Sequence, residues 1–309
     1  GDDQSGACSV GQLSVSTTMR LEICVAQVER RLADGGLYFG HGTDNAFDEA
    51  VWLALAAIEL DAGADQIPWQ KTLTDTEQAQ VEALLARRIR TRRPLAYLIN
   101  QAWFAGHEFF VDERVIVPRS HLGEWIVGCF APWLAGQPIA SILDLGTGSG
   151  CIAIALAHAF PAARVDASDL SSDALAVAAI NTRRHDIVDR VRLLRSNLFT
   201  GLAGQRYDLI VCNPPYVSDA IMGGLPDEYS YEPALAFAGG SEGLDFIDSL
   251  LREARTHLTD EGTLVVEAGS AKAAVEAAWP QVSFTWLTSL NGESVVFLLG
   301  AQELQQYRW

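Results

Sequence analysis

Apolar residues in the first hundred positions recur with the spacing of amphipathic helices. One apolar face is formed by side chains at i, i+3, i+4, i+7, i+8 and i+11, namely Phe47, Ala50, Val51, Ala54, Leu55 and Ile58. A second face consists of Val81, Leu84, Leu85 and Ile89. Thr74, with Glu77 three residues later, has the pattern of a capping box that opens this second helix. Residues 1–100 are therefore predicted to form a helical domain.

The pattern changes between residues 101 and 118. Short apolar runs at Trp103–Phe104, Glu108–Val111 and Val115–Val117 alternate there with polar residues typical of turns. This alternation predicts a β-hairpin that links the helical domain to the rest of the chain.

From residue 119 to the end at residue 309, strand-like and helix-like stretches alternate. The expected strands are 142–145, 164–169, 191–195, 207–212, 263–267, 282–287 and 294–299, and the clearest helices are 151–159, 171–184 and 243–257. Strands that alternate with helices predict an α/β domain with a doubly wound sheet.

One of these strands ends in an unusual loop. The run Leu209–Val211 has the length and branching of a strand buried on both faces, and it leads into Asn213, Pro214, Pro215 and Tyr216. Two successive prolines lack N–H groups and cannot continue a ladder of hydrogen bonds. The side-chain oxygen of Asn213 and the carbonyl of Pro214 would then form a pair of acceptors suited to a planar NH2 group. Without its partners elsewhere in the chain, the same loop would be read as a proline-rich turn after a core strand.

A glycine-rich loop lies between a predicted strand and a predicted helix. Asp144 precedes Gly146, Thr147, Gly148, Ser149 and Gly150, and glycines at such a turn allow a ligand to approach the backbone closely. Asp169 ends the next strand and can accept hydrogen bonds from both hydroxyls of a ribose. NAD would fit these features, but the loop lacks the full dinucleotide and phosphate-loop patterns.

The overall charge argues against nucleic acid as the main partner. Of the 309 residues, 49% are hydrophobic and 20% are charged, and the formal net charge is −17. Binding to a phosphate backbone requires a basic face, so a basic protein is the more natural partner, although acidity that only keeps the protein soluble explains the charge equally well. No apolar run is long enough to span a membrane, and the N-terminus has no features of a signal peptide.

The cysteines and histidines indicate neither disulfides nor a metal. The five cysteines are scattered without pairing, which is typical of a reducing cytoplasm, and the six histidines have no metal-ligand spacing. A cytoplasmic protein without a metal site is therefore expected.

Two local patterns have competing interpretations. The cluster Arg87, Arg88, Arg90, Arg92 and Arg93 is read as a solvated helix end rather than as a contact for RNA or for an acidic partner. The stretch Gly239–Gly243 matches the G-x-S-x-G pattern of hydrolases. However, residues 234–238 before it are a poor central strand and only His257 follows, so we interpret the match as a coincidence.

The glycine loop followed by Asn-Pro-Pro-Tyr resembles S-adenosylmethionine-dependent methyltransferases that act on planar NH2 groups. The chain is similar in particular to the HemK superfamily of protein-glutamine N5-methyltransferases and, within it, to the PrmB-type branch, which modifies the third protein of the large ribosomal subunit. The stretches that carry this resemblance are Tyr38–Asn45, Ala102–Arg114, Val117–Ser120, Leu225–Tyr229 and Phe284–Leu287. The spacing after Pro118 differs from the Pro-Arg-Pro-Asp-Thr-Glu of the sister branch, which modifies peptide release factors.

The resemblance implies a fold, a reaction and a set of functional residues. The fold would be that of a class I methyltransferase, with a mixed seven-stranded sheet (119–309), a hairpin linker (101–118) and an N-terminal helical domain that recognises the substrate (1–100). Residues expected to bind S-adenosylmethionine are Asp144, Gly146, Thr147, Gly148, Gly150, Asp169, Asn197, Leu198 and Asn213. Asn197 stands where an Asp is more usual, and its side-chain oxygen can still accept a hydrogen bond from adenine. The catalytic residues would be Asn213, Pro214 and Tyr216, and these three would bind the substrate together with Pro215.

The same resemblance implies the partner. The substrate would be a glutamine of a large-subunit ribosomal protein, either free or in an assembling ribosome, with no specificity for nucleic acid, no membrane and no metal. Two alternatives share the chemistry at nitrogen: the glutamine of peptide release factors and the N6 amine of adenine in DNA. DNA is the more distant alternative, because the chain offers no basic groove.

Overall fold

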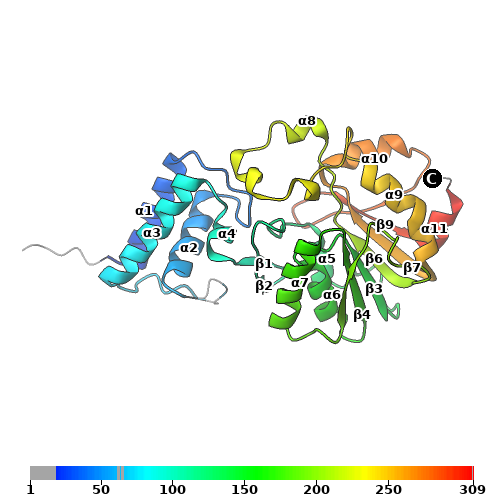
Figure 1. The fold of residues 1–309 in the computed structure, drawn as a ribbon, viewed down its shortest axis with the longest axis horizontal. Coiled ribbons are helices and arrows are strands. Elements are labelled where there is room, and N and C mark those ends of the chain that lie inside the picture. Colours follow the sequence, from blue (N-terminus) through cyan, green and yellow to red (C-terminus); the bar gives the residue numbers. More distant parts are fainter. Residues whose placement is uncertain (1–18, 61–62, 64–65, 308) are drawn as a thin grey trace, which may run out of the picture.

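The computed structural model describes residues 19–60, 63, 66–307 and 309, and it separates a group of helices from a large sheet (Figure 1). The helices of the first part are α1 (Leu21–Asp34), α2 (Ala46–Ala57), α3 (Asp75–Thr91) and α4 (Leu95–Ile99). Both halves of the predicted capping box open α3: Glu77 N donates to Thr74 Oγ1 over 3.1 Å, and Thr74 N donates to Glu77 Oε2 over 2.8 Å. The apolar faces of α1, α2 and α3 pack into one core cluster.

A short hairpin follows the helices. It pairs β1 (Ala102–Phe104) with β2 (His107–Phe109) in antiparallel register, and the turn between them contains Gly106 with φ of +79°. The expected strand at Val115–Val117 is absent, because Val115 N closes a turn on the Asp112 carbonyl over 3.1 Å, and Val115 and Val117 pack against the helical core instead of pairing with the hairpin. The predicted hairpin is therefore confirmed, but it ends at Phe109.

The remaining strands form one mixed sheet, as predicted. Their order is β5-β4-β3-β6-β7-β9-β8, where β9 is antiparallel to both of its neighbours and the first five strands are parallel. The strands are β3 (Ser141–Leu145), β4 (Arg164–Asp169), β5 (Val191–Arg195), β6 (Tyr207–Cys212), β7 (Leu258–Glu267), β8 (Thr285–Leu287) and β9 (Val296–Gly300). From β3 to β5 the strands add toward one edge of the sheet, whereas β6 lies on the other side of β3, so the strand order reverses between β3 and β6.

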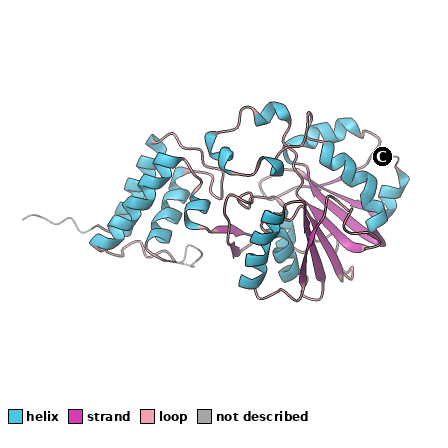
Figure 2. Ribbon diagram, in the orientation of Figure 1, coloured by secondary structure: helices cyan, strands magenta, loops and turns pink. Residues whose placement is uncertain are grey.

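Helices cover both faces of this sheet (Figure 2). Leu209 and Val211 of β6 face a cluster that includes α5 (Leu122–Val127) and α6 (Cys151–Ala159). Ile210 and Cys212 face the opposite cluster, which is shared with α9 (Asp245–Ala254), α10 (Lys272–Ala278) and α11 (Ala301–Gln306). Burial on both faces explains why this strand reads as a continuous apolar run. The helix α7 (Ser172–Arg184) packs on β4 and β5.

The arginine cluster at the end of α3 is only partly a solvated surface, because Arg87 and Arg90 are exposed and Arg88 is buried. Arg88 is 1% exposed, and its guanidinium donates to Glu49 Oε1 over 2.7 Å. Arg92 contacts Glu228 at 2.8 Å, and Arg93 pairs with Glu113. The prediction of a solvated helix end is wrong for Arg88, whereas Arg92 and Arg93 keep about a third of their side chains exposed, 32% and 31%. The acidic partners of all three are distant in sequence, so no local pattern predicts them.

None of the helices in the described part of the chain combines the length and the apolar character needed to cross a bilayer.

Candidate active site

The predicted functional loops meet at one edge of the sheet because their strands are neighbours in parallel register. Leu145, the last residue of β3, pairs with Ser168 of β4 on one side and with Cys212, the last residue of β6, on the other. The glycine loop and the Asn-Pro-Pro-Tyr loop therefore leave the sheet side by side at its carboxyl edge. This is also the point where the strand order reverses, at which open α/β sheets bind ligands.

The three loop glycines adopt backbone conformations that favour glycine. Gly146, Gly148 and Gly150 have φ values of +78°, +55° and +82°. A Cβ at Gly150 would lie 3.1 Å from Ala178 Cβ, whereas Gly146 and Gly148 face open space. Gly150 is thus needed for packing, and the other two leave backbone accessible to a ligand.

Asp144 forms hydrogen bonds with this loop and with the helix that follows it. Its Oδ2 accepts hydrogen bonds from Thr147 Oγ1 at 2.5 Å and from Ala153 N at 3.0 Å, while its Oδ1 is buried without a partner among the described residues. Complete burial raises the pKa of Asp144 from 3.8 to about 7. The side chains of Asp144 and Thr147 therefore bond to each other, and their expected contact with a cofactor remains a prediction.

Asp169 lies at the end of β4, next to the glycine loop. Its carboxylate accepts from Gly148 N and from Ser171 N, each over 2.8 Å. Burial raises the pKa of this carboxyl group above its usual value. Each oxygen keeps a further lone pair that can accept a hydrogen bond from a hydroxyl group.

The loop after β5 lies next to Asp169. Ser196 N donates to the Asp169 carbonyl over 3.0 Å, and this bond brings the following residues Asn197 and Leu198 to the same edge. Asn197 is exposed, and Leu198 is half-buried with φ of +47°. Both residues therefore lie beside Asp169, and their contact with adenine stays a prediction.

Asn213 follows β6 and carries the most informative atom of the site. Its Oδ1 is buried and accepts no hydrogen bond from any described residue. Buried acceptors are normally paired, because an unpaired one costs about 1–3 kcal/mol. An acceptor left free beside the buried Pro214 is suited to an N–H group brought by a ligand.

Tyr216 is held by a residue that the sequence did not single out. The phenolic O–H of Tyr216 donates to Glu267 Oε1 over 2.9 Å, at the end of β7. Glu267 is fully buried, and its Oε2 accepts from Ser120 Oγ and, over 3.0 Å, from His121 N. A Cβ at Gly269 would lie 2.3 Å from the Tyr216 ring, so only glycine fits there. A lone acid at the end of a predicted strand was the available signal for Glu267.

The Gly239–Gly243 stretch packs against this loop and does not form a hydrolase elbow. Cβ atoms at Gly239 and Gly243 would lie 2.9 Å from the Pro215 carbonyl oxygen and 2.3 Å from the Tyr216 carbonyl oxygen. The preceding segment, Ala234–Ala236, is a 3-10 turn and not a strand. These glycines support the shape of the Asn-Pro-Pro-Tyr loop.

The segment that continues from this loop docks on the helical domain. Glu232 is buried and accepts from both terminal guanidinium nitrogens of Arg119 over 2.6 Å each, from Val117 N over 2.8 Å, and lies 3.2 Å from His41 Nε2. Four residues earlier, Glu228 accepts from Tyr38 N over 3.0 Å. The stretches Tyr38–Asn45, Val117–Ser120 and Leu225–Tyr229, which are distant in sequence, are therefore joined.

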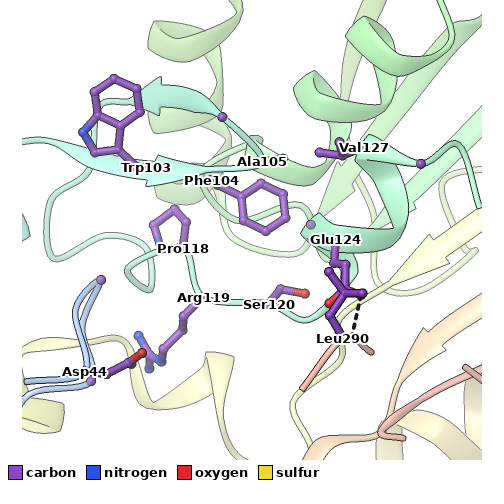
Figure 3. A pocket seen from close by; sticks show the side chains of 15 residues that line it. Asp44, Trp103, Phe104, Ala105, Pro118, Arg119, Ser120, Glu124, Val127 and Leu290 are labelled. Atoms are coloured by element: carbon purple, nitrogen blue, oxygen red, sulfur yellow. Dashed lines mark hydrogen bonds between the residues drawn. The ribbon is translucent and has the colours of Figure 1, made fainter. Parts of the chain in front are cut away.

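A cleft of about 690 Å³ opens between the helical domain and the sheet domain (Figure 3). Its lining comes from the first domain, the hairpin, α5 and the loop before β9: Gly40, Gly42, Asp44, Trp103, Phe104, Ala105, Gly106, Pro118, Arg119, Ser120, Gly123, Glu124, Val127, Gly128 and Leu290. Ser120, on its wall, contacts Glu267, which in turn contacts Tyr216. The wall of the cleft at Ser120 is thus linked to the Asn-Pro-Pro-Tyr loop through Glu267, and the lining carries acidic groups at Asp44 and Glu124 and a guanidinium group at Arg119.

Comparisons with known proteins found a matching family model, relatives of similar sequence and a solved structure that aligns in part. The family model of the methyltransferase small domain matches residues 130–223, which include the glycine loop, Asp169 and Asn213–Tyr216. The ribosomal protein uL3 glutamine methyltransferase of Xylella fastidiosa is 46% identical over 274 residues, which cover 89% of this chain and 88% of the relative. The enzyme of the same name from Burkholderia pseudomallei is 45% identical over 282 residues, with coverages of 89% and 92%. The crystal structure of a ribosomal protein L11 methylase from Lactobacillus delbrueckii subsp. bulgaricus aligns with a TM-score of 0.40 at 20% identity, over 61% of this chain and 82% of that one.

Proposed function

The chain belongs to the family of ribosomal protein uL3 glutamine methyltransferases, and we propose that it transfers a methyl group from S-adenosylmethionine to the side-chain amide nitrogen (N5) of a glutamine in uL3. Its fold is the predicted class I methyltransferase fold, with a mixed seven-stranded sheet and the methyltransferase small domain at residues 130–223. The same reaction on a glutamine of peptide release factors is the main competing hypothesis.

The free acceptor on Asn213 is the observation that carries the proposal. A glutamine amide nitrogen is a poor nucleophile, because its lone pair is delocalised into the carbonyl group. Asn213 Oδ1 and the Pro214 carbonyl would accept its two N–H groups and hold the nitrogen with one face open to the methyl donor. As the new N–C bond forms and the bond between methyl and sulfur breaks, with its electron pair going to sulfur, these oxygens would stabilise the positive charge that grows on nitrogen, and one amide proton would leave to water.

The residues around the glycine loop fit S-adenosylmethionine. When bound, the cofactor would supply an electrophilic methyl group on a positively charged sulfur. Gly146 and Gly148 leave space for a ligand against the backbone, and Asp169 keeps free lone pairs for the ribose hydroxyls. Asn197 and Leu198 stand beside Asp169, where an adenine would be bound.

Tyr216 would shape the methyl-transfer channel. Its ring is fixed by the bond to Glu267 and by the space at Gly269, and an aromatic face favours a neighbouring cation. It would pack on the planar amide of the substrate and exclude water from it.

The helical domain is proposed to choose the substrate. The cleft between the domains would take the polypeptide segment that carries the glutamine, with Asp44 and Glu124 facing basic side chains. The net charge of −17 favours a basic ribosomal protein as the occupant. Whether the enzyme acts on free uL3 or on an assembling subunit is a matter for the experiment below.

The decisive experiment is methyl transfer with isotope-labelled S-adenosylmethionine. Purified uL3, an assembling large subunit, peptide release factors and an adenine-containing DNA duplex are incubated in parallel, and the label is located by mass mapping of peptides. We expect the label on one glutamine of uL3, and the relative rates for the first two substrates identify the form recognised. Label on release factors alone would favour the competing hypothesis, and label on DNA alone would overturn the reading as a protein methyltransferase.

A further inference from the structure

Three histidines that are far apart in sequence converge at the edge of the sheet opposite the active site. His107 begins β2, His158 lies in the last turn of α6, and His185 follows the end of α7. One ring nitrogen from each lies within 4.8 Å of the others. Because α6 starts at the carboxyl edge of the sheet and runs away from it, this cluster lies outside the methyl-transfer site.

Two of the imidazoles already have the spacing of metal ligands. His158 Nε2 and His185 Nδ1 are 3.4 Å apart. Two nitrogens bound tetrahedrally to zinc at roughly 2.0–2.1 Å are about 3.3 Å apart. The pair therefore needs little movement to chelate an ion.

The surroundings of His185 prepare its Nδ1 as a ligand. Its Nε2 lies 2.9 Å from the carbonyl oxygen of Glu108, and a carbonyl can only accept, so Nε2 carries the proton. Nδ1 then keeps its lone pair, which accepts the hydrogen bond from His158 Nε2 in the absence of an ion. Phe109 stacks on the ring with a centroid distance of 4.9 Å. Metal-binding histidines are commonly fixed in this way by a hydrogen bond from the second ring nitrogen.

His107 supplies the third nitrogen. The His107 ring stacks on that of His158 with centroids 4.5 Å apart. A rotation of this half-exposed side chain would bring a nitrogen lone pair of His107 next to the nitrogens of His158 and His185.

We propose that His107, His158 and His185 bind one Zn²⁺ ion, each through one imidazole nitrogen, with water as the fourth ligand. Imidazole is a preferred ligand of zinc, whereas Mg²⁺ and Ca²⁺ prefer oxygen. The ion ties the interdomain hairpin to the ends of α6 and α7. Because hairpin residues Trp103–Gly106 line the cleft, zinc also fixes one wall of that cleft.

The test measures zinc binding directly and does not depend on methyl transfer. The full chain, with Cys8 and Cys129 replaced by Ser to remove competing thiols, is stripped with a chelator and titrated with Zn²⁺ by calorimetry. We expect one ion per chain with a micromolar or lower Kd and a rise in Tm. His107→Asn, His158→Asn and His185→Asn should each weaken binding by about tenfold or more.

His257→Asn is the matched control, because His257 stacks on Phe199 away from the cluster and its loss should leave the Kd unchanged. His107→Asn is the safest of the three variants, since its side chain is half-exposed on a short hairpin and its fold should be preserved. Zinc binding by the His107→Asn variant, or by the variant with all three histidines replaced, that is as tight as in the protein that keeps them would overturn the proposal. Failure of the stripped protein to bind Zn²⁺ below millimolar concentration would do the same.

Discussion

The Tyr216 hydroxyl donates to Glu267 Oε1 over 2.9 Å and joins the Asn-Pro-Pro-Tyr loop to the end of β7. The other oxygen of Glu267 receives Ser120 Oγ and His121 N, which belong to the segment between the hairpin and α5. One buried carboxylate therefore fixes both the proposed catalytic loop and a wall of the cleft. The orientation of the Tyr216 ring depends on a strand that contributes no other predicted catalytic group.

Removing this hydrogen bond should slow methyl transfer without unfolding the protein. Tyr216→Phe keeps the ring but removes its hydrogen bond to Glu267. We expect kcat to fall by about tenfold, since a hydrogen bond to a charged group is worth roughly 1.5–3 kcal/mol. The kcat of Glu267→Gln should fall at least as far, because the NH2 group of Gln cannot accept a hydrogen bond and the donors on one side of the carboxylate lose their acceptor. Steady-state rates with uL3 measure both variants. Glu261→Gln, an exposed acid on the same strand, is the control, and wild-type kcat in Tyr216→Phe would contradict the role assigned to the bond.

Loss of the free acceptor on Asn213 should separate chemistry from cofactor binding. Asn213→Ala removes one of the two oxygens that would hold the amide, and losses of this kind cost about 10²–10³ in kcat. We expect such a loss in kcat, with the Kd for S-adenosylmethionine raised by less than about fivefold. Calorimetry and single-turnover rates distinguish the two effects. The exposed Asn291, replaced by Ala, should change neither quantity, and near-normal turnover by Asn213→Ala would remove Asn213 from the mechanism.

The sheet could be predicted from the sequence because its strands are locally encoded. Runs such as Leu209–Val211 are continuous and apolar, and the glycines at 146, 148 and 150 mark a turn whose φ values favour glycine. The convergence of the loops then followed from the parallel strands. The prediction of a strand at Val115–Val117 was wrong, because the apolar side chains there pack against the helical domain.

Partners that are distant in sequence could not be predicted. Glu267 contacts Tyr216 only because β6 and β7 are neighbours in the sheet, and the spacing of residues along the chain does not reveal the order of the strands. Arg88 looks like part of a basic surface until Glu49 and Glu228 are placed against it. The three clustered histidines are separated by 27 to 78 positions, so no ligand spacing could reveal them.

The buried carboxylate of Glu232 should be a major source of stability for the interface between the domains. Although burial alone would raise its pKa, His41 and Arg119 together lower the pKa of Glu232, so it is ionised at neutral pH. Glu232→Gln leaves Arg119 without its charged partner, and breaking a buried pair in this way costs about 3–5 kcal/mol. Urea unfolding at pH 7 measures the loss. Glu242→Gln, at an exposed position in the same connecting region, should change the free energy of unfolding by less than about 0.5 kcal/mol, and an equal effect of both variants would contradict this role.

Asp144 should give the free energy of unfolding a distinctive pH dependence. Its folded pKa of about 7 lies above the unfolded value of 3.8, because burial disfavours the ionised form. Between these values the folded state holds the extra proton, so the stabilising contribution is complete below the unfolded pKa and is lost as the pH rises through 7. Asp144→Asn has no proton to lose. The stability of the variant relative to wild type should therefore rise by about 3 kcal/mol from pH 5 to pH 8.

Urea unfolding of the cofactor-free protein at several pH values measures this difference, and subtraction of the wild-type curve removes the background titration of a strongly acidic chain. The steric and hydrogen-bonding cost of the amide does not change with pH, so it shifts the difference without altering its slope. The exposed Gln205, replaced by Ala, provides a control in which no titrating group changes, and its difference from wild type should be constant. Parallel curves for Asp144→Asn and wild type would mean that Asp144 is already ionised in the folded protein at pH 5. The glycine loop would then rest on a charged carboxylate, and the bond from Thr147 would be charge-assisted throughout.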